Sequence, residues 1–273
     1  MSSPESGSNF SLSFFFLPRA KRQALSAVYA FCRHVDDIVD GQESSSEKFK
    51  MKGAREALQF WKTEIEQLYA GKPTHPIAQS LMPAVEKFKL PKESFLHIVE
   101  GVEMDLTVSR YKTFQDLEQY IFRVASSVGF LCIGIFGYQH PSAREYALNL
   151  GYAFQLTNIM RDVGSDLDRD RIYLPLEDLD RFGYSEKELR DRRYTPWFVE
   201  LMKFEYHRTK SYYQKARGFL SPVDRRNMRP AEVMAVIYEA LLEKIKRGGF
   251  DVFQEKISLN GWEKASQVLR VFV

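Results

Sequence analysis

Apolar residues recur every three or four positions along most of the chain, and this spacing is typical of amphipathic helices that bury one face. The first two such segments cover residues 20–39 and 47–69, and a loop rich in glycine and serine separates them. Later segments begin or end near prolines, which lack the N–H group that a helix interior needs. The pattern predicts further helices at residues 77–89, 92–107, 114–137, 142–165, 197–218, 231–247 and from about 261.

No linker and no fixed-period repeat interrupts this pattern, so a single all-α domain over residues 1–273 is predicted, with the serine- and glycine-rich residues 1–9 flexible. A chain of 273 residues can bury a sizeable core. Its 15 glycines and 11 prolines are few, which favours helices over a many-stranded sandwich.

Composition narrows the function classes. A net charge of +3 is too small to indicate nucleic acid, so no nucleic-acid partner is expected. Cys32 and Cys132 fall in apolar helical patterns without metal-ligand spacing, which favours reduced core thiols in a cytoplasmic protein. No uninterrupted apolar run reaches about 18 residues, so no transmembrane helix is expected, and residues 1–9 do not resemble a signal peptide.

One predicted helix carries polar residues where a core helix would be apolar. These residues recur three or four positions apart and therefore form one stripe among leucines, phenylalanine and isoleucine. Facing a core, they would cost several kcal/mol unless something paired with them. Solvent-facing stripes are usually rich in lysine and glutamate, whereas this one has amides and aspartates, which favours a bound cation. The stripe consists of Gly151, Gln155, Asn158, Asp162 and Asp166.

A second polar stripe lies on the first predicted helix and consists of Tyr29, Arg33, Asp36 and Asp40. Each stripe thus has two aspartates four residues apart. Four converging carboxylates would repel one another, and a divalent cation removes that conflict. Oxygen-only ligands suit Mg²⁺, while the absence of a His/Cys cluster argues against zinc. The predicted metal ligands are Asp36, Asp40, Asn158, Asp162 and Asp166.

Protein-bound Mg²⁺ is usually completed by substrate phosphates, so the predicted ligand is a phosphate or diphosphate. Arg33 and Arg161 would bind its remaining oxygens through their guanidinium groups, and Arg171 beyond the helix end is a further candidate. A single aspartate pair would more simply be exposed and paired with lysine or arginine. Two such pairs on polar stripes of apolar helices favour a site.

Val28–Asp40, and Gln155–Asp166 with Arg171–Pro175, resemble the two aspartate-rich signatures of the squalene/phytoene synthases. The resemblance covers nearly the whole chain. It implies a single-domain, all-α helical bundle of the isoprenoid synthase type around a central cavity. It also implies the head-to-head joining of two prenyl diphosphates with Mg²⁺.

The same resemblance implies roles by position. Tyr29, Arg33 and Gln155 resemble residues that line the family's diphosphate site, and Tyr238 lies where the family has a cavity tyrosine. Taken together with the residues argued from the two stripes, the predicted catalytic set is Tyr29, Asp36, Asp40, Asp162 and Asp166, and the predicted substrate-binding set is Tyr29, Arg33, Gln155, Asn158, Arg161, Arg171 and Tyr238.

Local details resemble the presqualene diphosphate synthases of bacterial hopanoid pathways. Within Arg123–Gly129, Ser126 replaces a glycine that most phytoene synthases have, and Gly101–Leu106 and Ile135–Tyr138 point the same way. The resemblance implies condensation of two farnesyl diphosphates to presqualene diphosphate, without NADPH. It also implies handover of the product to a downstream hopanoid-pathway enzyme.

The alternatives are a phytoene synthase that uses two geranylgeranyl diphosphates, a dehydrosqualene or squalene synthase, and a non-catalytic relative acting as an assembly factor. The last is expected to lose metal ligands, whereas both aspartate pairs are present here. Residues 14–22 join an aromatic run to basic residues, and they form either the first core turn or a peripheral contact with the inner face of a membrane.

Overall fold

The computed structural model describes residues 17–40, 47–254 and 257–272, and within these ranges it contains helices and no β-strand. Outside the helices, Arg110 and Ile172 form an isolated parallel bridge. The all-α prediction is therefore confirmed. The predicted flexibility of residues 1–9 falls outside the described residues.

The helices follow the predicted periodic segments, mostly to within two residues. The long helices are α2 (Arg19–Asp40), α3 (Glu47–Tyr69), α8 (Ala143–Leu167), α11 (Pro196–Phe219) and α12 (Arg229–Arg247). The shorter ones are α4 (Pro76–Phe88), α5 (Lys92–Met104), α6 (Phe114–Ile121), the π-helical turn η1 (Phe122–Ser126), α7 (Ser127–Phe136), α9 (Leu176–Arg181), α10 (Glu186–Arg190) and α13 (Gly261–Phe272). The sequence pattern missed α9 and α10 because each is too short to show a period.

Local sequence explains where several helices begin. The side chain of Thr195 accepts a hydrogen bond from the backbone N–H of Phe198, and Pro196 occupies the first turn of α11. Thr113 and Asp116 form a reciprocal capping box at the start of α6. These caps satisfy backbone N–H groups that have no partner within the helix.

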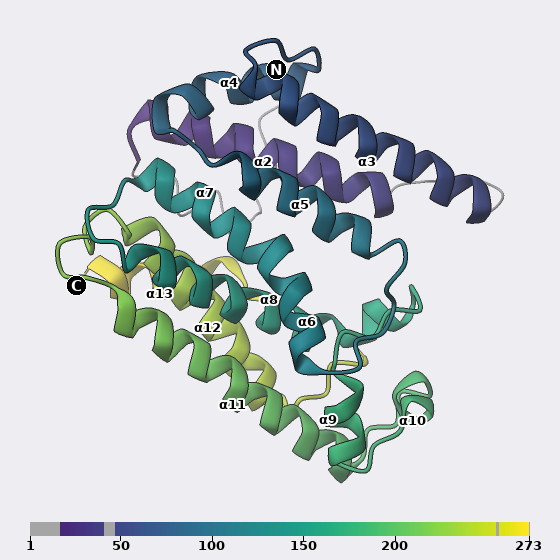
Figure 1. The fold of residues 1–273 in the computed structure, drawn as a ribbon. Coiled ribbons are helices and arrows are strands. Elements are labelled where there is room, and N and C mark those ends of the chain that lie inside the picture. The colour runs from purple at the N-terminus through teal and green to yellow at the C-terminus, as the bar shows by residue number, and fades with distance from the viewer. Residues whose placement is uncertain (1–16, 41–46, 255–256, 273) are drawn as a thin grey trace.

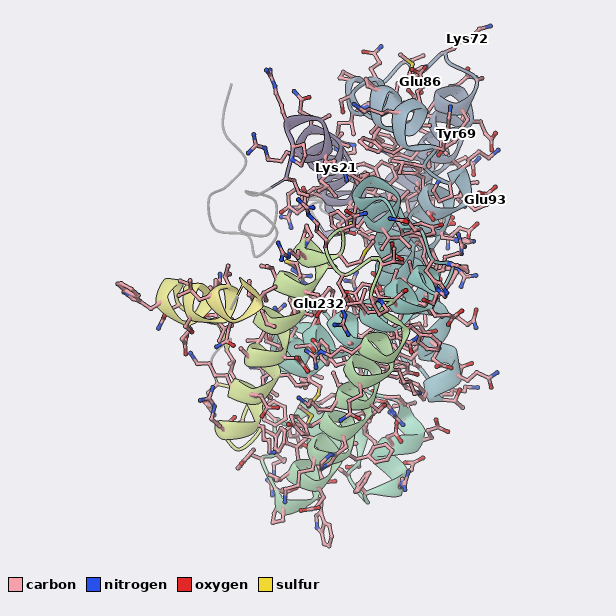
Figure 2. All side chains as sticks on the ribbon, turned by 90° about the vertical axis from the view of Figure 1, so that its left-hand side faces the viewer. Lys21, Tyr69, Lys72, Glu86, Glu93 and Glu232 are labelled. Carbon is pink, nitrogen blue, oxygen red and sulfur yellow. The ribbon has the colours of Figure 1, made fainter. Side chains whose placement is uncertain are left out.

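The bundle is layered around α8. In Figure 1, helices α2 to α5 lie on one side, α11 and α12 lie on the other, and α7 and α8 run between them. The main apolar core draws on residues from Ala24 in α2 to Phe253 near the C-terminus. A smaller apolar cluster joins the outer face of α12 to α13, which Figure 2 shows projecting from the body of the bundle.

Helix α8 and η1 approach closely at a glycine. A Cβ added to Gly151 would lie 2.7 Å from the Cα of Ser126 and 2.8 Å from its N and Oγ atoms. Ser126 is fully buried, and its hydroxyl donates to the carbonyl of Leu148 at 3.0 Å. The absence of a side chain at Gly151 therefore permits this helix contact.

The segment predicted as one helix over residues 114–137 is continuous but has the π-helical turn η1 in its middle. By length and composition alone, Phe114–Phe136 would be able to cross a membrane. The sequence criterion did not select it because Arg123, Ser126 and Ser127 interrupt the apolar run. The segment packs against α5 and α8, and a core position explains its composition equally well.

Candidate active site

A cavity of about 320 Å³ lies between α2, η1–α7, α8 and the first half of α12. Its wall changes character along its length. Charged and amide side chains from α2 and α8 line one end, with Tyr238 of α12 beside them. Leu25, Phe136 and Tyr146 line the other end, with Pro230 and Ala231. The volume is near the lower limit of about 300–1,000 Å³ for small-molecule pockets.

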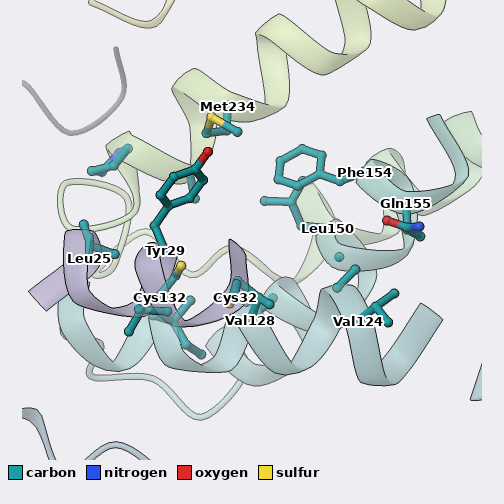
Figure 3. A pocket seen from close by; sticks show the side chains of 18 of the residues that line it. Leu25, Tyr29, Cys32, Val124, Val128, Cys132, Leu150, Phe154, Gln155 and Met234 are labelled. Atoms are coloured by element: carbon teal, nitrogen blue, oxygen red, sulfur yellow. The ribbon is translucent and has the colours of Figure 1, made fainter. Parts of the chain in front are cut away.

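The exposure of the wall differs between the two ends. Arg33 and Asp36 are exposed at the polar end. Leu25, Phe136 and Tyr146 are buried at the apolar end. Figure 3 shows Leu25 and Gln155 at opposite ends, with Tyr29 and Phe154 projecting into the space between. The cavity therefore opens at its polar end and is closed at its apolar end among the described residues.

Much of the predicted site is brought together on this wall. Residues of both polar stripes line the cavity, so each stripe supplies part of one shared surface. The predicted site residues that line it are Tyr29, Arg33, Asp36, Gln155, Asn158 and Tyr238. Asp40 is the last residue of α2, and its side chain lies outside the described part of the chain.

Asn158 tests whether this wall fits a cation. Its side-chain Oδ1 atom is buried and has no hydrogen-bond partner. A buried carbonyl oxygen without a partner is costly and rare, so an atom of this kind on a cavity wall is well suited to coordinate a cation. Among the described residues no three acidic, histidine or cysteine side chains form a complete site. A cation here would therefore need oxygen atoms from its ligand, as Mg²⁺ commonly does.

Arg161 and Asp162 pair with each other and do not line the main cavity. The Nε of Arg161 donates to Oδ1 of Asp162 at 2.9 Å, and Nη2 donates to Oδ2. Burial opposes the charge of Arg161, but the hydrogen bonds to Asp162 outweigh it and raise the pKa of the guanidinium. Arg161 was predicted to bind diphosphate, but in this structure its guanidinium group binds the carboxylate of Asp162.

Asp166 and Arg171 line a separate, much smaller cavity together with Tyr173. Burial and the nearby Asp162 carboxylate raise the pKa of Asp166 to about 7. The predicted stripe on α8 therefore divides. Gly151, Gln155 and Asn158 face the large cavity, whereas Asp166 faces the small one. The crowded carboxylates have the repulsion that a cation would relieve.

Sequence reasoning missed a polar cluster around Asp105. Tyr173 donates its hydroxyl to Oδ1 of Asp105 at 2.8 Å, and Tyr120 donates to Oδ2 at 3.1 Å. The two rings stack with centroids 5.2 Å apart. Burial raises the pKa of both tyrosines above the ordinary range, so both hydroxyls remain donors. The only signal in the sequence was Asp105 itself, because its partners lie 15 and 68 residues away.

Ser126 and the two cysteines lie at positions relative to the cavity that the sequence did not predict. Ser126, which carried the resemblance to presqualene diphosphate synthases, is in the contact between η1 and α8 and not on the cavity wall. Cys32 and Cys132 are free thiols in apolar helices, as expected, but both line the cavity. Burial raises the pKa of both thiols, which keeps them in the neutral form.

Fold and site together define a class of protein. An all-α bundle encloses a cavity whose open end is polar and whose closed end is apolar. This arrangement matches a ligand with an anionic head and a long hydrocarbon tail, as in helical enzymes that act on prenyl diphosphates. A sequence model of the squalene/phytoene synthase family matches residues 3–263, and the chain belongs to this family.

Curated relatives agree with this assignment. The chain is 36% identical over 259 residues to the 15-cis-phytoene synthase of Synechocystis sp., covering 90% of this chain and 75% of the relative. It is 35% identical over 265 residues to the phytoene synthase of Thermus thermophilus, covering 97% and 88%.

Solved structures agree as well. The squalene synthase HpnC from Alicyclobacillus acidocaldarius superposes with a TM-score of 0.80 at 32% identity, covering 89% of each chain. A dehydrosqualene synthase gives a TM-score of 0.83 at 26% identity, covering 98% of this chain and 91% of that one. The protein is thus a prenyltransferase-type, head-to-head prenyl diphosphate synthase, and such enzymes generally use divalent metal ions.

Proposed function

We propose that the protein condenses two molecules of farnesyl diphosphate to presqualene diphosphate and releases one diphosphate, with Mg²⁺ as the metal. The observation that carries this proposal is the cavity itself, which is polar and open at one end and apolar and closed at the other. The small volume and the resemblance around Ser126 favour the shorter farnesyl chain over geranylgeranyl.

Different residues on the cavity wall would bind the diphosphate, hold the metal and exclude water. Arg33 at the open end would bind diphosphate oxygens, and Asp36 and Asn158 on the wall would hold Mg²⁺. Asp162 and Asp166 lie off this wall in the structure, so they would have to turn toward the cavity to join the metal ligands with Asp40. When bound, Mg²⁺ neutralises charge that develops on the departing diphosphate. The apolar remainder of the wall excludes water from the allylic cation that is left behind.

The carbon chemistry follows from this arrangement. The 2,3-double bond of the second farnesyl chain attacks the first carbon of the cation, and loss of a proton then closes a cyclopropane ring. The released diphosphate or Tyr29 accepts the proton. Tyr29, Phe154 and Tyr238 line the cavity, and the faces of their rings would stabilise the cation.

An assay without a reductant tests the proposal. Purified protein is incubated with Mg²⁺ and either farnesyl or geranylgeranyl diphosphate, without NADPH, and products are identified by mass spectrometry. We expect a thirty-carbon cyclopropyl diphosphate from farnesyl diphosphate. Squalene that appears only when NADPH is added would instead assign the protein to the reductive enzymes.

Phytoene synthase is the second candidate, and the curated relatives favour it. Matches at 34–36% identity carry that name. The two functions share the metal and diphosphate chemistry and differ in chain length. Forty-carbon phytoene formed from geranylgeranyl diphosphate in the same assay would overturn the farnesyl proposal.

We further propose a cytoplasmic enzyme that touches the inner face of a membrane through residues 14–22 and passes its apolar product to a later hopanoid-pathway enzyme. Within the described part of this segment, Arg19 and Arg22 are exposed, and Lys21 donates to the carbonyl of Phe136 at 2.6 Å. Exposed basic groups suit an anionic membrane surface. Phe15→Asp should weaken sedimentation with anionic liposomes, and unchanged sedimentation would contradict the membrane contact.

A further inference from the structure

The closed end of the cavity is built from four different helices. Leu25 comes from α2, Phe136 from α7, Tyr146 from α8, and Pro230 and Ala231 from α12. On each helix these are the lining residues farthest along the axis from the polar end. We call this group the cavity floor. All of its members are buried, so a hydrocarbon chain that enters from the polar end must stop here.

Helix geometry gives the distance from the polar end to the floor. Leu25 and Asp36 are eleven residue steps apart on α2, and Tyr146 and Asn158 are twelve steps apart on α8, which gives roughly 16–18 Å at a rise of about 1.5 Å per residue. Diphosphate bound near Asp36 shortens the length left for hydrocarbon.

Carbon–carbon bonds of about 1.5 Å advance an extended chain by about 1.25 Å each, so a farnesyl chain spans about 14 Å and a geranylgeranyl chain about 19 Å. The extended farnesyl chain is therefore close to the available length. The extended geranylgeranyl chain exceeds the whole axis.

Tyr146 differs from the other floor residues because its ring is pinned. It is fully buried, and its hydroxyl donates to Oε1 of Glu232 at 2.5 Å. Figure 2 shows Glu232 on α12, on the side toward the other helices. Leu25 and Phe136 are apolar, and packing alone holds their side chains in place. Displacing the Tyr146 ring would break a charge-assisted hydrogen bond and leave the buried tyrosine hydroxyl without a partner.

We propose that Tyr146 is the residue that limits prenyl chain length in this enzyme, and that Glu232 is the positioning residue that holds it in place. This inference rests on the proposed function and deepens it, because it states how the site selects farnesyl and rejects geranylgeranyl chains. Ser126, where the sequence pointed, does not reach the cavity wall.

The test compares chain-length preference in matched variants. In Tyr146→Leu the floor recedes, and the ratio of kcat/KM for geranylgeranyl over farnesyl diphosphate should rise about tenfold or more. Tyr146→Phe keeps the ring and removes only the hydrogen bond, so the ratio should rise less. Glu232→Leu should behave like Tyr146→Phe, whereas Glu232→Gln keeps an acceptor and should restore the wild-type ratio.

Tyr206→Phe is the control. Tyr206 is 5% exposed and donates to Oε1 of Glu243 at 2.6 Å, so it has the same chemistry as Tyr146 but lies off the cavity wall. Its ratio should not change. Folded Tyr146→Leu and Tyr146→Phe proteins that keep the wild-type ratio would overturn the proposal.

Binding separates this proposal from the proposed function. Affinities for farnesyl and geranylgeranyl thiodiphosphates, which are not turned over, are measured by calorimetry with Mg²⁺ present. If the wild type prefers the shorter analogue and Tyr146→Leu abolishes this preference, the role of Tyr146 in limiting chain length is supported, even if no presqualene diphosphate is formed. If the wild type binds both analogues with equal affinity, the proposal that Tyr146 limits chain length is overturned, even if presqualene diphosphate is formed.

Discussion

At the scale of single residues, Asn158 lowers the stability of the fold but lies where a bound cation would need a ligand. Its Oδ1 atom is buried without a partner on the wall of the cavity. We expect Asn158→Leu to raise the free energy of unfolding in metal-free buffer by about 1–3 kcal/mol, because it removes an unpaired buried oxygen. The same change should abolish turnover. Urea unfolding and the product assay measure the two effects.

Asn149→Leu is the matched control for that experiment. Asn149 is on the same helix and is 7% exposed, but its Nδ2 donates to the carbonyl of Glu145 at 2.8 Å. Replacing a satisfied amide should not stabilise the protein. Equal stabilisation by both variants would mean that the missing partner of Asn158 is not the cause.

The aspartates make a second residue-scale prediction. Asp36→Asn and Asp162→Asn should each lower Mg²⁺-dependent kcat by about 10²-fold or more, because each removes a charge from the metal-binding set. Circular dichroism should show an intact fold for both variants, since Asp36 is exposed and an asparagine at position 162 still has an oxygen that accepts from Arg161. Glu56→Gln in the exposed Lys52–Glu56 pair on α3 is the control and should leave kcat unchanged. Near-normal activity in either aspartate variant would refute the two-pair site.

At the scale of elements, the crossing of α8 over η1 depends on Gly151. The Gly151→Ala variant should lose about 2–3 kcal/mol of unfolding free energy, because the new Cβ would meet backbone atoms of Ser126 that are unable to move independently. Gly218→Ala near the end of α11 is the control. Its Cβ would have open space around it, so that change should be neutral or stabilising by up to about 1 kcal/mol. Chemical denaturation of both variants measures the difference.

The helices themselves were largely predictable, and the reason is physical. Each long helix buries one face, so apolar residues recur along its sequence with the helical period. Residues 47–69 are an example, since they form α3 with the same bounds as predicted. The segment 92–107 was predicted too long, since α5 ends at Met104. The π-helical turn η1 leaves no periodic signal that distinguishes it from the helices on either side.

The candidate site was predictable only in part. Stripes on α2 and α8 identified Arg33, Asp36 and Asn158 because each stripe lies on one helix. The hydrogen bonds of Asp105 to Tyr120 and Tyr173, and that of Tyr146 to Glu232, join distant segments and have no local pattern. Ser126 was interpreted through its neighbours in sequence, whereas its role is set by α8, which lies against it in space.

At the scale of the whole molecule, a buried cluster of charged side chains joins α9 to α11 away from the cavity wall. Arg208 donates through Nη1 to Oδ2 of Asp178 and to Oε1 of Glu205, both at 2.7 Å. Its guanidinium also lies 4.1 Å from the centroid of the Phe114 ring. Asp178 and Glu205 are 3% and 2% exposed, so two carboxylates share one cation away from water. Burial, with the Asp178 carboxylate nearby, raises the pKa of Glu205 to about 8.

This shift should make global stability depend on pH in a defined window. Between the ordinary glutamate pKa of 4.5 and about 8, the folded protein holds a proton on Glu205 that the unfolded chain has released. Stability from this group is therefore complete below the lower value and is lost as pH rises through the upper one. A shift of this size corresponds to a loss on the order of 5 kcal/mol.

Urea unfolding of wild type and Glu205→Gln at several pH values between 5 and about 9 isolates this group. The glutamine resembles the protonated acid, so the variant should lack this component of the pH dependence and should gain on the wild type as pH rises. Glu56→Gln should keep the wild-type profile, because Glu56 is exposed on α3. A constant difference between wild type and Glu205→Gln at every pH would show that Glu205 is ionised throughout the window. Arg208 would then balance both carboxylates, and the stability of the α9–α11 contact would not depend on this proton.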